Sequence, residues 1–314
     1  MNDSTMLSVD SSFLDGEVTE SGAVHASANM SNGRYKGSFY NAAGYSRFAR
    51  HHRKIGFRIL AEYYQLIADL PFPVKALDVG CGTGELTRLL SYFGNVQEVL
   101  AIDLSAEQLA IAETFSTDDR INYQIADIHD VHCLPTKQRN CYFQLCIAMA
   151  TFDWLSDAPN AFDNIQRCLK PGGYLLAWSL ACFPQRYRKL LQALRESQRW
   201  KAQAQEVEQS LKRTFNPGWW KSEEPETHMA ELLECSGFEV LSLTLEDDQM
   251  TYSLDELTGE IAMMKSICGN SVKEKDYPEF LEFCTRAYQS HFEKLDGDYY
   301  LSHRKILVIF ARKV

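Results

Sequence analysis

A short apolar strand, a glycine-rich turn and a helix follow one another early in the chain, and this order permits few folds. Residues 76–79 are apolar and end at a turn signal, which predicts a central strand of a parallel sheet. Leucines then recur at helical spacing over residues 85–93. Glycines at positions 80, 82 and 84 allow a sharp turn and close approach of a ligand, because they carry no side chain. The segment therefore predicts a nucleotide pocket in an α/β fold.

The spacing of these glycines indicates the kind of ligand. A dinucleotide fingerprint reads G-x-G-x-x-G and places a pyrophosphate at the helix N-terminus. Here the order is G-x-G-x-G, and Asp78 stands two residues before the first glycine. A pyrophosphate gains nothing from that carboxylate, whereas the ammonium group of an amino acid forms a favourable pair with it.

Later apolar runs end in acidic residues at the spacing of a Rossmann-like unit. Asp103 closes the run that begins at Val99 and lies nineteen positions after Gly84 (103 minus 84), near the offset of about 20 at which a carboxylate binds ribose hydroxyls. Residues 121–128 predict an alternating strand that ends in an acid, Asp127. Residues 142–150 predict a fourth strand, and L-K-P-G-G at 169–173 predicts the turn into a fifth.

Residues 77–84 read L-D-V-G-C-G-T-G, which resembles the first motif of class I S-adenosylmethionine-dependent methyltransferases. The resemblance implies an α/β, Rossmann-like fold with a seven-stranded, mostly parallel sheet, helices on both faces and helical lid insertions. It also implies S-adenosylmethionine as donor, S-adenosylhomocysteine as product and no metal. Taken alone, Asp103 or Asp127 is more often a helix cap or a loop acid. The residues implied to bind the cofactor are Asp78, Gly80, Cys81, Gly82, Gly84, Asp103, Leu104, Asp127, Ile128 and Ala148.

Composition predicts how the chain is divided. Residues 1–33 contain five acids and no Lys or Arg, and we expect a flexible acidic leader. We expect a single methyltransferase domain over 34–314, with insertions at strand ends where acceptor specificity usually resides. Its expected parts are a cap helix in 34–72, a cofactor-binding core over 73–182, and helical substrate lids at 183–224 and 251–299.

A helix is expected from about residue 47 to residue 70. In related small-molecule methyltransferases a similar segment lies over the cofactor, so Tyr40 and Arg50 are candidates for cofactor contacts and Tyr45 for the acceptor. The basic residues of this helix also fit a solvated helix face.

The later part of the chain resembles the trans-aconitate and juvenile hormone acid methyltransferases in its layout. Those carboxyl methyltransferases carry a Gln-Trp or His-Trp pair just after the fourth strand, where this chain has Asp153 and Trp154. Asp153 disfavours a carboxylate acceptor. The candidate residues for the acceptor are Tyr45, Trp154, Trp219, Trp220 and Tyr252, although paired tryptophans serve equally well as helix anchors.

A hydroxyl or amine acceptor must lose a proton, whereas a carboxylate needs no base. The candidate bases are Asp153, His52, His51 and His129. Asp153 could instead cap the helix that starts near Ser156 or hydrogen-bond the backbone. The favoured hypothesis is methylation of an O or N atom of a small-molecule acceptor, in a biosynthetic role. Two alternatives stay open: carboxyl O-methylation of small organic or isoprenoid acids, and a catalytically idle regulatory subunit that binds S-adenosylmethionine.

Charge and composition exclude other partners. The formal net charge is -10, which argues against nucleic acid because phosphate-rich partners need a basic face. No apolar run reaches membrane-spanning length, and no secretory signal stands at the N-terminus. Nine cysteines without a C-x-x-C pair predict reduced thiols in a cytoplasmic protein and no zinc site. The sequence leaves monomer and homodimer equally open.

Overall fold

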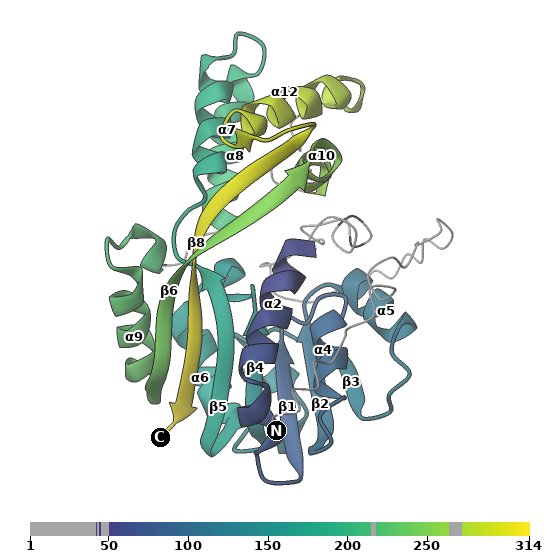
Figure 1. The fold of residues 1–314 in the computed structure, drawn as a ribbon, viewed down its shortest axis with the longest axis vertical. Helices are drawn as coiled ribbons and strands as arrows, with labels where there is room; N and C mark the ends of the chain where they lie inside the picture. Colours follow the sequence, from purple (N-terminus) through teal and green to yellow (C-terminus); the bar gives the residue numbers. More distant parts are fainter. Residues whose placement is uncertain (1–41, 43, 45–49, 215–217, 264–271) are drawn as a thin grey trace, which may run out of the picture. The chain divides into compact units, whose positions relative to one another are not determined.

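A mixed β-sheet forms the centre of the computed structural model, which describes residues 42, 44, 50–214, 218–263 and 272–314 (Figure 1). In the described part, seven strands run in the order β3-β2-β1-β4-β5-β8-β6, and a two-residue strand, β7, pairs with β8. Strands β1 to β5 pair in parallel, while β8 is antiparallel to both β5 and β6. The predicted Rossmann-like, mostly parallel sheet is confirmed. The bounds are β1 Val74–Val79, β2 Val96–Asp103, β3 Ile121–Ile125, β4 Phe143–Met149, β5 Leu169–Leu180, β6 Phe238–Ser253, β7 Glu293–Lys294 and β8 Tyr299–Lys313.

Helices cover both faces of this sheet. The chain passes from β1 to β2 in one direction across the sheet and from β4 to β5 in the other, so right-handed crossovers place their helices on opposite faces. Figure 1 shows α2 and α4 in front of the sheet and α6 behind it. The helices of the core are α2 Arg50–Glu62, α3 Tyr64–Ala68, α4 Glu85–Leu90, α5 Ala106–Thr114, α6 Ala158–Cys168 and α9 Pro225–Cys235.

Helix α2 lies against the start of α4, next to the glycine turn. A Cβ atom at Gly56 would lie 2.4 Å from Cδ1 of Leu86, so the absence of a side chain at position 56 lets the two helices approach. The single helix predicted over 47–70 is divided in two, because the backbone at Tyr63 leaves the helical region before α3 begins. Residues 47–49 lie outside the described part.

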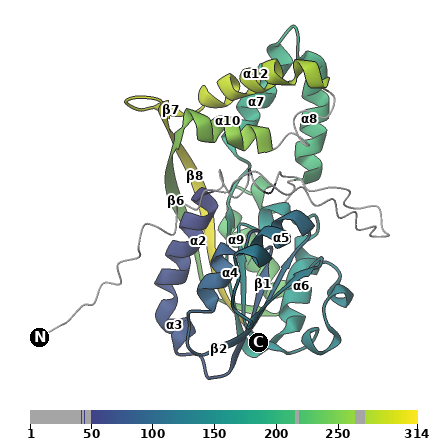
Figure 2. The same ribbon diagram turned by 90° about the vertical axis from the view of Figure 1, so that its right-hand side faces the viewer.

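Strands β6 and β8 pair with each other far beyond the rest of the sheet. Pairing of β5 with β8 ends at Leu180 and Ile306, whereas β6 and β8 stay paired as far as Ser253 and Tyr299. The first half of β8 shows no apolar alternation in the sequence, because the residues that it buries include the polar Ser302 and Arg304. Figure 2 shows this two-stranded extension together with the helices that follow β5 and β6. These helices are α7 Gln185–Glu196, α8 Lys201–Thr214, α10 Leu254–Met263 and α12 Tyr277–Gln289.

Among the described residues, no helix combines the length and the hydropathy needed to cross a membrane.

Candidate functional site

The glycine turn lies at the carboxyl end of β1. All three glycines have positive φ values, 71° at Gly80, 57° at Gly82 and 76° at Gly84. The backbone N–H groups of Gly80 and Cys81 both donate to the carbonyl oxygen of Ile102, at 2.8 and 3.0 Å. A Cβ atom at Gly80 would lie 2.4 Å from Oγ1 of Thr151. Both the backbone conformation and the available space therefore require glycine at the start of the turn.

Asp103, the last residue of β2, holds the middle of this turn. Its Oδ2 accepts the N–H of Gly82 at 2.9 Å, and its Oδ1 accepts the N–H of Ser105 at 2.8 Å. Burial raises the pKa of the Asp103 carboxyl, and these N–H groups oppose the shift. A carboxylate has about four acceptor positions, so two hydrogen bonds leave capacity for the hydroxyls of a ribose. Leu104 beside it is 45% exposed and offers an apolar surface at the same sheet edge.

Asp78 attaches the turn to the helix that follows it. The side chain is buried, and its Oδ2 accepts a hydrogen bond from Oγ1 of Thr87 at 2.6 Å. Burial raises the pKa of Asp78 to about 7, and the charge of Asp103 adds to the shift. Asp78 therefore has a structural role that the sequence did not reveal, and its contact with a ligand ammonium group stays a prediction.

The segment after β3 is ordered by its own hydrogen bonds. Oδ1 of Asp127 accepts the backbone N–H of His129 at 2.9 Å and lies 2.8 Å from His129 Nδ1. The carbonyl oxygen of Ile128 accepts from Nδ2 of Asn164 at 2.8 Å. The side chains of Ile128 and Ala148 are buried, and contact of either residue with a cofactor stays a prediction. His129 is held by Asp127, and its role as a base stays a prediction.

Asp153 lies in a 3-10 turn, η4 Phe152–Trp154, at the carboxyl end of β4. The side chain is buried, and its Oδ1 accepts Oγ of Ser179 at 2.6 Å and the N–H of Leu180 at 3.0 Å. Burial raises the pKa of Asp153 to about 7, while these hydrogen bonds and the nearby Arg304 and Arg186 act in the opposite direction. Asp153 thus joins the ends of β4 and β5, which fits the predicted backbone-bonding alternative.

The two tryptophans in η5 Gly218–Lys221 anchor the same place from the other side. Nε1 of Trp219 and Nε1 of Trp220 each donate to the carbonyl oxygen of Leu180 at 2.9 Å. Both indoles are buried. Their hydrogen bonds correspond to the helix-anchoring alternative, and contact with an acceptor stays a prediction.

Two adjacent histidines of α2 face aromatic residues of the sheet. The rings of His51 and His52 are 4.1 Å apart, His51 lies 5.4 Å from the ring of Tyr252, and His52 lies 5.7 Å from that of Trp178. Burial lowers the pKa of both histidines, and nearby cations lower it further. Both imidazoles are therefore neutral near pH 7 and able to accept a proton there only weakly.

Two basic residues of α2, Arg50 and Arg53, contact different parts of the structure. Arg50 forms an ion pair with Glu256 of α10 and donates to the carbonyl oxygen of Thr251 at 3.2 Å. Arg53 instead lies 3.7 Å from Glu85, the first residue after the glycine turn, and its buried Nη1 has no hydrogen-bond partner in the described chain. Arg53 is thus closer to the turn than the predicted Arg50. In the sequence, Arg53 stands three residues after Arg50, which places both on one face of a helix. Solvated basic helix faces show the same spacing, so this pattern did not single out Arg53 as a site residue.

Comparison with known proteins identifies the core. Residues 77–177 match the family described as a methyltransferase domain. This core resembles a methyltransferase domain. The match includes the glycine turn, Asp103 and Asp127, and it stops within β5.

Relatives of the methyltransferase domain share only part of their length with this chain. A malonyl-[acyl-carrier protein] O-methyltransferase of Pectobacterium atrosepticum is 34% identical over 145 residues, covering 46% of this chain and 52% of the relative. One from Marinomonas sp. is 33% identical over 120 residues, covering 37% and 43%. The chain therefore spans about half the length of these relatives or less.

Solved structures support the same methyltransferase fold. A Bacillus halodurans protein described as a methyltransferase superposes with a TM-score of 0.52 at 21% identity, covering 81% of this chain and 98% of that one. The YcgJ protein of Bacillus subtilis superposes with a TM-score of 0.51 at 16% identity, covering 84% and 99%.

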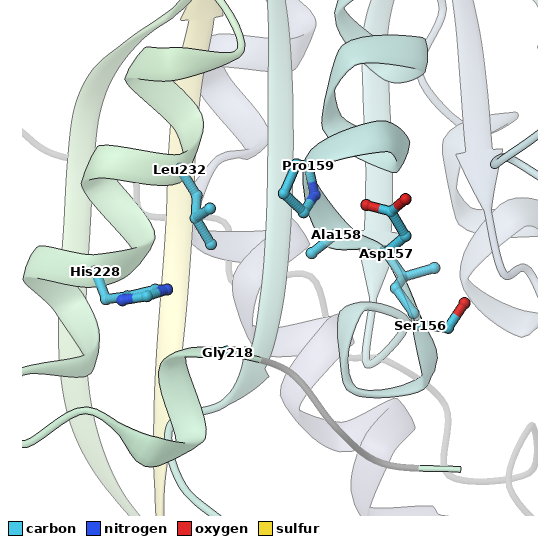
Figure 3. Close-up of a pocket in the computed structure, with 8 residues that line it drawn as sticks. Ser156, Asp157, Ala158, Pro159, Gly218, His228 and Leu232 are labelled. Carbon is cyan, nitrogen blue, oxygen red and sulfur yellow. The ribbon is translucent and has the colours of Figure 1, made fainter. Parts of the chain in front are cut away.

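A pocket between the start of α6 and helix α9 is lined by none of the residues of the glycine turn. Leu155, Ser156 and Asp157 line it before α6, and His228 and Leu232 of α9 line it from the other side. Figure 3 shows Leu232 and His228 of α9 across the pocket from Pro159. None of the predicted site residues lines this pocket.

The methyltransferase fold brings most of the predicted residues to the carboxyl edge of the sheet. The glycine turn, Asp103 and Asp127 follow neighbouring strands there, and Asp153 lies at the end of the adjoining strand. Arg50 is paired with Glu256 of α10 instead. Tyr40 and Tyr45 lie outside the described residues. In the described part, no group of His, Cys, Asp and Glu has the arrangement of a metal site.

Proposed function

We propose that the protein is an S-adenosylmethionine-dependent methyltransferase that transfers a methyl group to a small-molecule acceptor. The observation that carries the proposal is the junction of the glycine turn with Asp103. Positive φ values at three glycines bring backbone to a ligand, and a carboxylate stands at the offset for ribose. Leu104 adds apolar surface suited to an adenine ring.

Residues of this chain would bind and orient the donor, which supplies an electrophilic methyl group when bound. Asp103 would accept hydrogen bonds from ribose hydroxyls, and Asp127 with the backbone at Ile128 would face the adenine. Arg53 is well placed for the amino-acid carboxylate, because its Nη1 lies 3.7 Å from Glu85 at the start of α4 and forms no hydrogen bond in the described chain. Positioning of both reactants supplies most of the rate in such a displacement.

A second candidate, carboxyl O-methylation, is favoured by the state of Asp153. Its Oδ1 already accepts two hydrogen bonds from Ser179 and Leu180, which weakens the argument that Asp153 serves as a base. A carboxylate acceptor needs no base. The relatives are named for O-methylation of malonyl groups on an acyl-carrier protein, and an acid of this kind is an acceptor to include in any test.

We place the reaction in the cytoplasm.

The test is transfer of a labelled methyl group from S-adenosylmethionine to pooled acids, phenols and amines. Transfer to phenols or amines supports methylation at a hydroxyl or amine, and transfer only to acids supports the second candidate. Binding of the donor without transfer to any pool would favour the idle regulatory subunit. A protein that binds neither S-adenosylmethionine nor S-adenosylhomocysteine would contradict the proposal as a whole.

Replacing Asp153 with asparagine tests its role through pH. The pKa of Asp153 rises from 3.8 to about 7 on folding, so the folded state binds more protons than the unfolded state between these values, and stability falls as pH rises through this range. The Asp153→Asn variant lacks this loss, and we expect its stability relative to wild type to increase from pH 4 to pH 7 and then level. Denaturant unfolding at several pH values measures it.

Turnover gives the second half of the same test. If Asp153 is the base, wild-type kcat rises as pH passes about 7, and the asparagine variant loses both this rise and most of its turnover. Unchanged kcat with unchanged pH dependence would show that Asp153 has only the structural role of joining β4 and β5.

A further inference from the structure

A buried polar cluster lies where helix α2, the sheet and the lid helices meet. It consists of His51 of α2, Trp178 of β5, Arg186 of α7, Glu260 of α10 and Arg304 of β8, which come from five separate parts of the chain. Each of these side chains is at least nine-tenths buried. Polar groups so deeply buried are normally all hydrogen-bonded.

Several polar atoms of the cluster have no hydrogen-bond partner in the described chain. They are Nη1 of Arg304, Nε1 of Trp178, both ring nitrogens of His51 and Oε2 of Glu260, whose other oxygen pairs with Arg186. A buried polar group left unpaired costs about 1–3 kcal/mol, and more when it is charged. Four side chains with unpartnered polar atoms in one cluster, three of them donors, indicate a site that a ligand completes rather than a stabilising core.

The cluster lies beside the predicted reaction centre. Trp178 pairs with Met149, the last residue of β4, and Leu180, two residues further on, donates to Asp153. The β5–β8 register continues to Ala181, whose N–H donates to the carbonyl oxygen of Lys305 at 2.9 Å. Arg304, the next residue along β8, is close enough to Asp153 and to His51 to lower the pKa of each.

Strand register places two of the unpartnered donors on one face of the sheet. Trp178 lies opposite Val308, and side chains of alternate residues share a face, so Val308, Ile306 and Arg304 project on the side of Trp178. The ring of His52, beside His51, lies 5.7 Å from that of Trp178, so this is the face covered by α2. His51, Trp178 and Arg304 therefore line the same side.

The two guanidinium groups of the cluster, those of Arg186 and Arg304, differ in how many partners they already have. Arg186 lies 3.1 Å from Oε1 of Glu260 and donates from Nε to the hydroxyl of Tyr288 at 3.2 Å. Arg304 donates from Nε to Oδ2 of Asp248 at 2.6 Å and contacts Sδ of Met250, but its Nη1 remains without a partner. One guanidinium N–H and neutral donors of Trp178 and His51 suit a carboxylate.

We propose that Arg304, with His51 and Trp178, binds a carboxylate of the acceptor that is not itself methylated. The proposal rests on the proposed methyltransferase function and specifies its acceptor class. A carboxylate paired with a guanidinium has its charge balanced and is a weaker nucleophile, so the group that Arg304 holds is an anchor. The acceptor therefore carries a carboxylate in addition to the oxygen or nitrogen that attacks the methyl group.

Binding of matched acids and neutral esters tests this class of acceptor. The protein is loaded with S-adenosylhomocysteine and titrated calorimetrically with two pairs of ligands. The first pair is 4-hydroxybenzoate and its methyl ester, and the second is monomethyl glutarate and dimethyl glutarate. We expect at least one acid to bind tenfold or more tightly than its ester. We expect Arg304→Met to remove this preference without changing the affinity for S-adenosylhomocysteine.

Control variants separate this role from a structural one. Arg304→Lys keeps a charge but not the planar fork and should retain part of the preference. His51→Phe keeps an aromatic ring beside Tyr252 and removes the ring nitrogens, so it should lower the affinity for the acid severalfold. This variant replaces Arg304→Met in the test if Arg304→Met does not fold. Arg312→Met changes an arginine of the same strand whose side chain is 44% exposed, and it should leave every affinity unchanged.

Three results would overturn the proposal: no binding of either acid, equal affinity for acid and ester, or an unchanged preference in both Arg304→Met and His51→Phe. Failure to bind S-adenosylhomocysteine would instead contradict the proposed function. In that event, the same titrations on the unloaded protein decide whether the anion site exists.

Discussion

Replacing Gly80 with valine abolishes binding of S-adenosylhomocysteine and lowers the free energy of unfolding by about 2–4 kcal/mol, as expected from strain plus overpacking. The residue has a φ of 71°, which a β-branched residue does not adopt without strain. Its Cβ would also lie 2.4 Å from Oγ1 of Thr151, whose hydroxyl donates to the carbonyl oxygen of Val79 at 2.8 Å. Calorimetric titration and urea unfolding measure the two effects.

Gly94→Ala is the matched control for this substitution. No heavy atom lies within 4 Å of the position that a Cβ would take at Gly94. We expect this variant to bind like wild type and to change stability by less than about 1 kcal/mol. If Gly80→Val bound S-adenosylhomocysteine as tightly as Gly94→Ala does, the glycine turn would not be the donor site.

Replacing Arg186 with methionine is expected to lower stability by about 3–5 kcal/mol, because the change leaves a buried carboxylate without its partner. Arg186 pairs with Glu260, and both side chains are 7% exposed. The hydrogen bond from Arg186 to Tyr288 extends the contact to α12, so one guanidinium joins α7, α10 and α12. Urea unfolding followed by tryptophan fluorescence reports the loss.

An exposed arginine of the same lid provides the comparison. Arg286 pairs with Glu282 within α12, and both side chains are more than half exposed. Arg286→Met should cost less than about 0.5 kcal/mol, since exposed i,i+4 pairs contribute little. Equal losses in the two variants would mean that the buried pair does not hold the lid helices together.

The donor side could be predicted because its signals are local in sequence. The glycine turn, Asp103 and Asp127 each follow a strand within a few residues, and parallel strands bring their carboxyl ends to one edge. The lengths of β6 and β8 could not be predicted, because their far halves extend past β5 and lack the apolar pattern of a buried strand. A two-residue strand such as β7 gives no pattern at all.

The acceptor side could not be predicted for a different reason. Asp153 receives its hydrogen bonds from Ser179 and Leu180, and the unpartnered donors come from positions 51, 178 and 304. Such contacts depend on how distant segments pack, which one sequence does not reveal. The same limit explains why Arg53 was grouped with a solvated helix face and why Trp219 and Trp220 allowed two interpretations.

The most direct test of the donor site is calorimetric titration of S-adenosylhomocysteine into the wild-type protein and the Asp103→Ala variant. We predict saturable binding of one molecule per chain to wild type. The variant loses the acceptor for ribose hydroxyls and the clamp on Gly82, which should weaken binding by about a hundredfold or more, since hydrogen bonds to a charged group contribute about 1.5–3 kcal/mol each. Absence of binding to wild type, or equal binding to both proteins, would contradict the assignment of this site.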